Sequence, residues 1–485
     1  MATIDGTDNN DILSGSSDND KINGKAGDDV LMGLAGDDII EGGDGNDVLI
    51  GNRGDDFLEG NKGNDTMLGG AGNDILEWDD GDGSDLMVGG HGEDVVEVNG
   101  AVAAGDDFAL QQRDGLAIFD RLNLVPFTLT VDESETFDIE GKGGDDRLTV
   151  GDLAATDVKR VKFSGGAGDD TLDASGSSTP IEAYGGSGND TLTGSSAADI
   201  LRGGDGSDFV KGGKGNDTMI GGRGNDVLVW EDGDGSDHIS GNQGRDTVGV
   251  IGSVSQGDEF TLNQEGNLAI FDRVNLVPFK LTVDTSEAFV IQGDVGNDSL
   301  DVNNLSHTDV NVVQFSGGEG NDLLDGSDTY TELVGSGDAG DDILVGGFAS
   351  DILEGGDGDD ILNGRGGNDT LTGGAGVDWF DFGVGSPFDK NKLGIDIITD
   401  FTDEFIRLER ATFGPIELTD IQIVSDDAAA ALSDGLITYS LGTGNLFFNQ
   451  NGAESGLGEG AQFATLAGAP SVVVQNFEIV DSFPV

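Results

Sequence analysis

Apolar residues in the first part of the chain recur at a fixed interval of nine positions. They are Leu13, Ile22, Leu31, Ile40, Leu49, Leu58, Met67 and Leu76. Between them lie polar segments that begin with Gly and carry Asp in sixth place, as in Gly24–Asp29. A short strand with one inward side chain, followed by a tight turn, accounts for this period. Repetition of strand and turn predicts a solenoid with two units, or eighteen residues, in each coil.

The turn segments have Gly in first and fourth place, and Gly accepts a positive φ angle without steric strain. In a solenoid with eighteen residues per coil, aspartates eighteen residues apart stack on the same edge. Like charges at that separation repel each other unless a cation lies between them. Carboxylate and carbonyl oxygens are hard ligands that select Ca²⁺ over transition metals. The turns are therefore candidate calcium sites.

Three blocks of such turns supply the candidate calcium ligands. They are Asp11, Asp20, Asp29, Asp38, Asp47, Asp56, Asp65, Asp74, Asp170, Asp190, Asp199, Asp208, Asp217, Asp226, Asp322, Asp342, Asp351, Asp360, Asp369 and Asp378. Pairing residues eighteen apart predicts about a dozen calcium ions. Sites that use Asp11, Asp20, Asp199 or Asp351 depart from the pattern, because their turns lack the fourth Gly.

The unit resembles the calcium-binding nonapeptide GGxGxDxUx of the RTX (haemolysin-type) family. The resemblance implies a parallel β-roll in which each ion lies between neighbouring turns, held by Asp carboxylates and backbone carbonyls. It also implies export by type I secretion. A disordered Gly/Asp-rich tract is the alternative interpretation. Disorder does not require an apolar residue at every ninth position, so we favour the β-roll.

A second, longer repeat has an offset of 152 residues, which separates Trp78 from Trp230 and Phe119 from Phe271. It divides the chain into alternating calcium blocks and β-rich spacers. The predicted boundaries are 1–96 for block 1, 97–164 for spacer 1, 165–248 for block 2, 249–316 for spacer 2, 317–378 for block 3 and 379–485 for a C-terminal cap. The fold class is therefore all-β: parallel β-roll blocks, inserted β-rich spacers and a C-terminal β cap.

The last segment is rich in Phe and includes LITYSLGTGNLFFNQNG, which predicts a β-hairpin. It resembles the cap and secretion-signal region of serralysin-like RTX proteins. A solenoid also needs its last coil covered. The terminal residues Asp481-Ser-Phe-Pro-Val are similar to the ends of several type I substrates. Type I secretion machinery is therefore an expected partner.

The chain has 23 Lys and Arg against 94 Asp and Glu, a formal charge of −71. Such a charge excludes nucleic acid as an expected partner. There is no Cys, no apolar run long enough to span a membrane, and no basic and apolar signal segment at the amino terminus. With the family resemblance, this favours a secreted, extracellular protein, with association to a cell surface as a further option.

Catalytic motifs are absent from the sequence: it contains no H-E-x-x-H, no G-x-S-x-G and no thiol. The repeats begin within the first dozen residues, which leaves no room before them for a catalytic domain. We therefore expect a calcium-folded structural, surface or matrix protein and not an enzyme. An extracellular hydrolase with an unrecognised site is one alternative.

The spacers carry the other alternative, a carbohydrate-binding adhesin. Phe119, Arg121 and Phe127, with their equivalents Phe271, Arg273 and Phe279, form either a sugar-binding face or a core with a structural ion pair. We favour the core. Trp78 is likewise interpreted as a residue that covers the adjacent coil rather than as a ligand platform.

Overall fold

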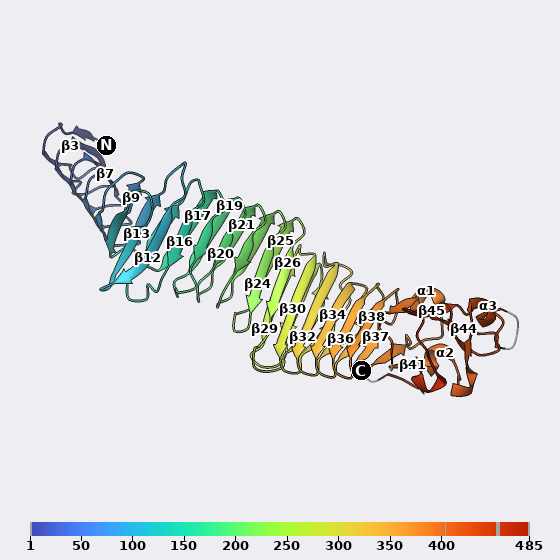
Figure 1. Ribbon diagram of the computed structural model, residues 1–485. Helices are drawn as coiled ribbons and strands as arrows, with labels where there is room; N and C mark the ends of the chain where they lie inside the picture. The colour runs from blue at the N-terminus through green and yellow to red at the C-terminus, as the bar shows by residue number, and fades with distance from the viewer. Residues whose placement is uncertain (1, 403, 453–455, 484–485) are drawn as a thin grey trace. The chain divides into compact units, whose positions relative to one another are not determined.

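The computed structural model describes residues 2–402, 404–452 and 456–483. The protein is all-β, with about 50% strand and 4% helix. It divides into two compact units, unit 1 (Met1–Asp246) and unit 2 (Thr247–Val485). Each unit stacks short parallel strands, one coil after the next (Figure 1). The parallel β-solenoid predicted from the nine-residue period is confirmed.

One sheet of unit 1 is parallel throughout, and each strand pairs with the next one named. Its strands are β1 (Ala2–Asp5), β3 (Asp20–Ala26), β5 (Ile39–Asp44), β7 (Phe57–Lys62), β9 (Ile75–Asp79), β11 (Val95–Asn99), β15 (Thr136–Glu140), β17 (Arg160–Ala167), β19 (Ile181–Ser187), β21 (Ile200–Asp205), β23 (Thr218–Arg223) and β25 (His238–Gln243).

The second sheet of unit 1 runs in the order β2 (Ile12–Ser14), β4 (Val30–Met32), β6 (Val48–Arg53), β8 (Thr66–Ala71), β10 (Leu86–His91), β14 (Phe127–Asp132), β13 (Leu116–Arg121), β12 (Asp107–Arg113), β16 (Arg147–Val150), β18 (Thr171–Asp173), β20 (Thr191–Thr193), β22 (Phe209–Lys211) and β24 (Val227–Glu231). Strand β13 is antiparallel to both of its neighbours. The spacer thus adds an antiparallel strand to the second sheet while the first sheet continues without interruption.

The eighth-place residues form the core of the coils. Ile22 pairs in register with Ile40, and Leu31 with Leu49, each exactly one coil apart in the ladder. All four side chains are fully buried. A slip of one residue would turn every one of these side chains to solvent, so the apolar period fixes the register.

The spacer of unit 1 is held by stacked aromatic rings. Trp78 lies 3.7 Å from Phe127 between ring centroids, and Phe119 lies 5.0 Å from Phe108. Trp78 and Phe119 are fully buried, and Phe127 is 5% exposed. The indole nitrogen of Trp78 donates a hydrogen bond to the Gly83 carbonyl at 3.0 Å. The core interpretation of these residues is the one that the structure supports.

Unit 2 has the same construction. One sheet has the order β26 (Thr247–Ile251), β30 (Ala288–Val295), β32 (Val312–Glu319), β34 (Glu332–Ala339), β36 (Ile352–Asp357), β38 (Thr370–Ala375), β40 (Asp396–Ile398), β45 (Gln462–Leu466), β44 (Asn445–Phe448), β43 (Ile437–Ser440) and β42 (Ile421–Val424). The other has β29 (Phe279–Asp284), β28 (Leu268–Arg273), β27 (Glu259–Glu265), β31 (Ser299–Val302), β33 (Leu323–Asp325), β35 (Ile343–Val345), β37 (Ile361–Asn363), β39 (Trp379–Phe382), β41 (Phe405–Glu409) and β46 (Phe477–Val480).

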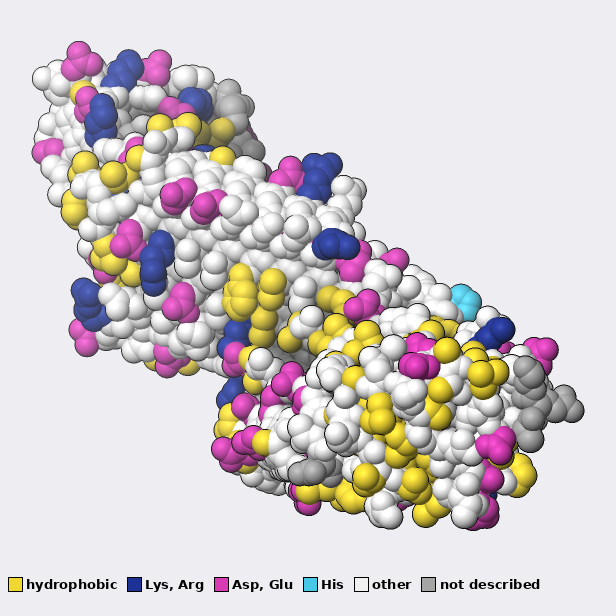
Figure 2. All heavy atoms as spheres, turned by 45° about the vertical axis from the view of Figure 1, so that its right-hand side comes forward, with side chains coloured by type: hydrophobic (Ala, Val, Ile, Leu, Met, Phe, Trp, Pro, Cys, Tyr) yellow, Lys and Arg dark blue, Asp and Glu magenta, His cyan; other side chains and the backbone are white. Residues whose placement is uncertain are grey.

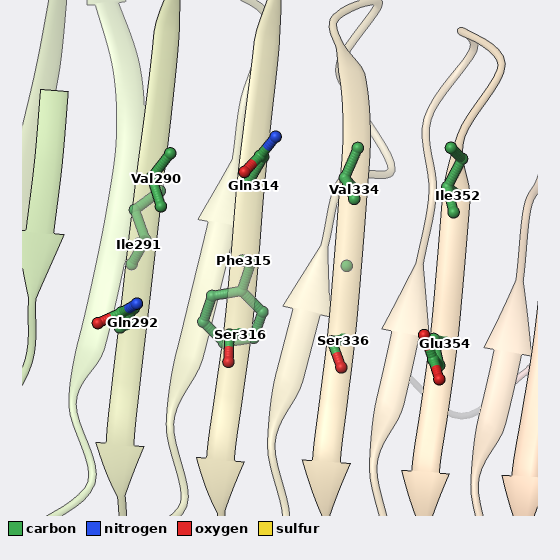
Figure 3. A pocket seen from close by; sticks show the side chains of 11 residues that line it. Val290, Ile291, Gln292, Gln314, Phe315, Ser316, Val334, Ser336, Ile352 and Glu354 are labelled. Carbon is green, nitrogen blue, oxygen red and sulfur yellow. The ribbon is translucent and has the colours of Figure 1, made fainter. Parts of the chain in front are cut away.

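The exposed residues on the outer faces vary between strands that share the same inward pattern. In unit 1, Glu41, Glu59 and Glu77 stand in register on successive coils. In unit 2, the outward residues of β30, β32, β34 and β36 include Gln314 and Val334, whereas Phe315 points into the core (Figure 3). The core pattern is therefore shared, while the exposed positions have diverged.

The C-terminal part covers the last coils with short helices and aromatic side chains. It contains α1 (Lys390–Leu393), α2 (Arg410–Phe413), α3 (Asp427–Ala430) and the 3₁₀ turns Leu418–Asp420 and Val474–Asn476. Strands β43 and β44 form the predicted hairpin. Phe463 is fully buried and lies 5.2 Å from Phe382 between ring centroids. Hydrophobic side chains also gather on the surface of this cap (Figure 2). Of the predicted C-terminal signal, Pro484 and Val485 lie outside the described residues.

Candidate metal centre

The sixth-place aspartates form ladders along the edges of each solenoid unit. In most of these turns, the backbone N–H of the aspartate donates to Oδ1 of the aspartate one coil further on. Asp29 donates to Asp47 at 2.7 Å, and Asp47 donates to Asp65 at 2.7 Å. The same bond spans twenty residues from Asp65 to Asp85, where the turn is longer. One oxygen of each carboxylate is therefore used by the fold itself.

The other carboxylate oxygen, Oδ2, is buried and has no hydrogen-bond partner in most of these turns. This holds for Asp29, Asp38, Asp47, Asp56, Asp65, Asp74, Asp94, Asp146, Asp170, Asp190, Asp208, Asp217, Asp226, Asp237, Asp298, Asp322, Asp342, Asp360, Asp369 and Asp378. A buried carboxylate oxygen without a partner is costly, because it has lost its hydration and gained nothing in return. A cation bound beside each of these oxygen atoms would offset that cost.

The surroundings of these oxygens contain further acceptors. A methyl group placed on Gly42 would lie 2.5 Å from Asp47 Oδ2 and 2.6 Å from the Gly60 carbonyl oxygen. A carboxylate and a carbonyl thus converge beside a glycine that has no side chain to fill the space. Because both groups are acceptors, they repel each other without a cation. This all-oxygen donor set fits Ca²⁺, which would supply the missing positive charge.

No group of three or more His, Cys, Asp or Glu side chains converges on one point among the described residues. The ladder explains this, since the carboxylates alternate with backbone carbonyls instead of clustering. A metal ion here would depend on main-chain oxygens as much as on side chains. The turn conformation therefore decides whether a site exists.

The fourth glycine sets that conformation. Gly45 has φ of 151° and Gly63 has φ of 149°, values that a residue with a Cβ rarely adopts. The second residue of the same turns also has a positive φ, 116° at Gly43 and 64° at Asn61. With this backbone, the N–H of the second residue does not reach the aspartate, and Oδ2 stays without a partner.

The four turns that lack the fourth glycine cap their own aspartate. Backbone N–H groups four residues earlier donate to Oδ2: Thr7 to Asp11 at 2.6 Å, Ser16 to Asp20 at 2.7 Å, Ser195 to Asp199 at 2.6 Å and Gly347 to Asp351 at 2.7 Å. The hydroxyls of Thr7 and Ser16 add a second bond to the same oxygens. In these turns a local hydrogen bond occupies the oxygen that is free elsewhere.

A third kind of turn uses a protein cation. In the spacer of unit 1, Arg121 is buried and its Nε donates to Asp106 Oδ1 at 2.7 Å, while Nη2 donates to Asp80 at 2.7 Å. In unit 2, Nη1 of Arg273 donates to Asp258 Oδ1 at 3.0 Å, while its Nε donates to the Val277 carbonyl at 3.1 Å. The structural ion pair expected for the FDR segments is therefore present. It neutralises an aspartate of the ladder without a metal.

Burial in the calcium-free fold raises the pKa of the ladder carboxylates. The pKa reaches about 8 for Asp65, about 7 for Asp74 and about 6 for Asp47, because desolvation disfavours the charged form. Burial also raises the pKa of the capped Asp351 to about 6. In contrast, the hydrogen bond from the Ser16 hydroxyl lowers the pKa of Asp20.

Sequence reasoning restricted to the nine-residue grid omitted four aspartates that share the same geometry. Asp94, Asp146, Asp237 and Asp298 each have a buried Oδ2 without a partner. Their turns keep Gly in fourth place, as in Gly89–Asp94, but longer connections displace them from the grid. The fourth glycine, rather than the spacing of nine, was the signal that identifies them.

Comparison with protein families agrees with this geometry. The family model of the RTX calcium-binding nonapeptide repeat (4 copies) matches residues 5–40, 41–76, 162–178, 184–219, 193–228, 231–248, 314–328, 336–371 and 354–388. The chain carries RTX calcium-binding repeats. The matched RTX segments include turns of both kinds, those with the fourth glycine and those that are capped. A comparison with curated proteins found no match.

The RTX repeats indicate calcium binding. Proteins with such repeats are typically secreted, and the repeat fold typically serves structural or binding roles. In the part of the chain that the structure describes, no helix is long and apolar enough to cross a membrane.

Proposed function

We propose that this protein is an extracellular scaffold whose RTX turns bind calcium and whose folding depends on that binding. The observation that carries the proposal is the series of buried Asp Oδ2 atoms without a partner. In turns such as the one that ends at Asp47, Oδ2 faces a carbonyl oxygen, so the calcium-free fold concentrates uncompensated negative charge in a chain of formal charge −71.

The proposed ligands are the aspartates of turns with the fourth glycine, including Asp94, Asp146, Asp237 and Asp298. Asp11, Asp20, Asp199 and Asp351 are proposed as capped turns that complete the coils without binding an ion through Oδ2. The domain boundaries given above remain a prediction.

Folding coupled to calcium suits export. At low intracellular calcium, carboxylate repulsion and chain entropy would keep the polypeptide unfolded and able to pass through type I secretion machinery. At extracellular calcium about ten times the Kd of a site, each ion adds roughly 1.4 kcal/mol to stability. Kd values of about 10⁻⁴ to 10⁻³ M are expected for such modules.

In the adhesin alternative, aromatic residues of the spacers would bind a sugar, but the structure buries these residues. Phe119 and Phe271 are fully buried, and Phe127 and Phe279 are 5% and 6% exposed. These rings present no face to a sugar. A structural or binding role is therefore proposed, and an extracellular hydrolase remains an alternative without a site to support it.

Far-UV circular dichroism during a calcium titration from a chelator tests the proposal. We expect a cooperative gain of β signal with calcium and little gain with equal magnesium, because magnesium gives up its water ligands reluctantly. A full β signal in the chelator would contradict folding coupled to calcium.

A further inference from the structure

Unit 2 exposes two stacked aromatic side chains, Tyr330 and Phe348, called here the aromatic pair. Their ring centroids lie 4.8 Å apart, with planes at 28°. Tyr330 is 66% exposed and Phe348 is 37% exposed. Elsewhere in this unit, aromatic rings such as Phe271 and Phe289 are fully buried. An exposed, stacked aromatic pair marks a surface suited to a ligand.

The backbone holds the aromatic pair in place. Tyr330 lies between β33 and β34, and Phe348 is the third residue of the capped turn that ends at Asp351. The N–H of Phe348 donates to the Thr329 carbonyl at 3.0 Å, which ties the two segments together. The capped turn, in which the aspartate already has its hydrogen bonds, is thus the turn that presents Phe348 to solvent.

Two hollows meet at the aromatic pair, and both are lined by Tyr330 and Phe348. One has a volume of about 570 Å³ and the other about 500 Å³. The larger hollow is also lined by Asn368, Lys390, Asn391 and Lys392. The smaller is also lined by Asn263, Gln264, Asn303, Asn304 and Asp328. The two together form a groove that continues past the rings on both sides, as an extended ligand requires.

Positive charge gathers on one side of this groove. The Arg365 guanidinium lies 5.7 Å from the centroid of Phe348, and its Nε is buried without a hydrogen-bond partner. Lys390 and Lys392 are exposed, and neither forms an ion pair with any described residue. In a chain with four times more acidic than basic residues, unpaired cations around one aromatic pair are unusual. They favour an anionic ligand.

The duplicated part of the chain shows that the fold does not require this surface. At the offset of 152 residues, Tyr330 corresponds to Ser178 and Phe348 to Ser196 in unit 1. Arg365 corresponds to Gly213. The surrounding strands nevertheless have the same order and register in both units. The aromatic and basic residues are therefore an addition to one copy.

We propose that the groove across the aromatic pair binds an acidic polysaccharide. The C–H face of a sugar ring would stack on Tyr330 and Phe348, and the amides along the groove would bond its hydroxyls. Lys390 and Lys392 would bind its carboxylates, and Arg365 beside Phe348 would add positive charge. An acidic peptide is disfavoured, because acidic peptide motifs are recognised by clusters of Arg, whereas the described lining of this groove has amides and two Lys but no Arg.

Calorimetric titration of the full chain in calcium with hexagalacturonate tests this proposal. Tyr330→Ser and Phe348→Ser copy the residues of unit 1 and should fold, which circular dichroism on the same samples checks. Each should weaken binding by roughly tenfold, as expected for the loss of one aromatic contact. Lys390→Gln with Lys392→Gln should weaken binding and reduce its dependence on salt. Calcium is the same in every sample, so its own affinity for galacturonate cancels between variants.

The matched controls lie in unit 1, where Tyr184 is 48% exposed and Lys214 is exposed. Tyr184→Ala and Lys214→Gln should leave the affinity unchanged. The proposal is overturned if hexagalacturonate does not bind, or if neutral cellohexaose binds equally well. It is also overturned if hexaglutamate binds as tightly, which would indicate an acidic peptide, or if the control variants weaken binding as much.

Discussion

Two turns of unit 1 place an aspartate at the same position but give its carboxylate different hydrogen bonds. At Asp47, a glycine in fourth place gives a backbone in which Oδ2 is buried without a partner. At Asp199, Ala197 stands in fourth place and the N–H of Ser195 donates to Oδ2 at 2.6 Å. In both aspartates Oδ1 accepts a backbone N–H from the preceding coil, that of Asp29 at Asp47 and that of Ile181 at Asp199. The main difference is therefore at Oδ2 and accompanies the glycine in fourth place; at Asp199 the Ser195 hydroxyl also donates to Oδ1 at 3.1 Å.

This contrast separates structure from metal binding within one repeat. The capped turn satisfies its carboxylate with local hydrogen bonds and needs no ion. The turn with the fourth glycine leaves its carboxylate unsatisfied, so its stability depends on a cation from outside. Arg121 shows a third solution, in which the chain supplies the cation itself. A solenoid that mixes these turns retains some coils whose carboxylates are satisfied without calcium.

The largest expected effect is that of pH on the calcium-free protein. Burial in the fold raises the pKa of Asp65 to about 8 and of Asp217 to about 8, well above the ordinary value of an unfolded aspartate. The folded state then holds protons that the unfolded state has lost. Stability in a chelator should therefore fall as the pH rises from about 4 to about 8. The far-UV β signal in a chelator at several pH values measures this, since the chain is proposed to be unfolded in the chelator near neutral pH.

Calcium should change that dependence, because it requires the deprotonated carboxylates. With calcium present, we expect the unfolding midpoint to be flat or to rise between pH 5 and pH 8. A β signal in the chelator that rises over the same range would contradict the raised pKa of the ladder aspartates.

The next effect in size tests the fourth glycine directly. Gly45→Ala places a Cβ at φ of 151° and against the Gly27 carbonyl of the preceding coil. We expect a loss of about 1–3 kcal/mol from backbone strain, and more where the coil cannot shift. Ala197→Ser, at the same place in a capped turn, should change stability by less than about 0.5 kcal/mol. Chemical denaturation in calcium compares the two, and equal losses would refute the distinction.

Much of this architecture could be predicted from the sequence, since apolar period and turn period repeat in phase. Residues such as Leu31 and Ile40 had to lie inside once the nine-residue unit was recognised, and both are fully buried. The role of Phe119 as core also followed from its place among alternating strands, and Trp78 was expected to cover the adjacent coil. These predictions depend on local chain geometry, and the same local pattern recurs in every repeat.

Two features could not be predicted in this way. The antiparallel strand β13 enters one sheet only, and nothing in its alternating pattern states which sheet it joins. The site at Tyr330 and Phe348 depends on a contact between two loops, with Arg365 contributed by the next coil. Single residues at non-repeating positions carry no period, so their meeting in space becomes visible only in the folded chain.

The smallest effect gives the sharpest comparison, because its sign depends on calcium. In Asp47→Asn, the amide oxygen can still accept the N–H of Asp29, and the amide nitrogen replaces the unpartnered Oδ2 near the Gly60 carbonyl. Without calcium, the variant should be more stable than the parent, since it removes a buried charge. With calcium at about ten times the site Kd, it should lose roughly 1.4 kcal/mol for each ion no longer bound.

Asp199→Asn is the matched control for this reversal. Its amide nitrogen would face the N–H of Ser195, so two donors would meet where a carboxylate now accepts. We expect a loss of about 1–3 kcal/mol in calcium and in chelator alike. Denaturant unfolding in calcium and the far-UV β signal in the chelator compare both variants with the parent under both conditions. The distinction between the two kinds of turn fails if Asp47→Asn is destabilising in the chelator. It also fails if the effect of Asp199→Asn depends on calcium.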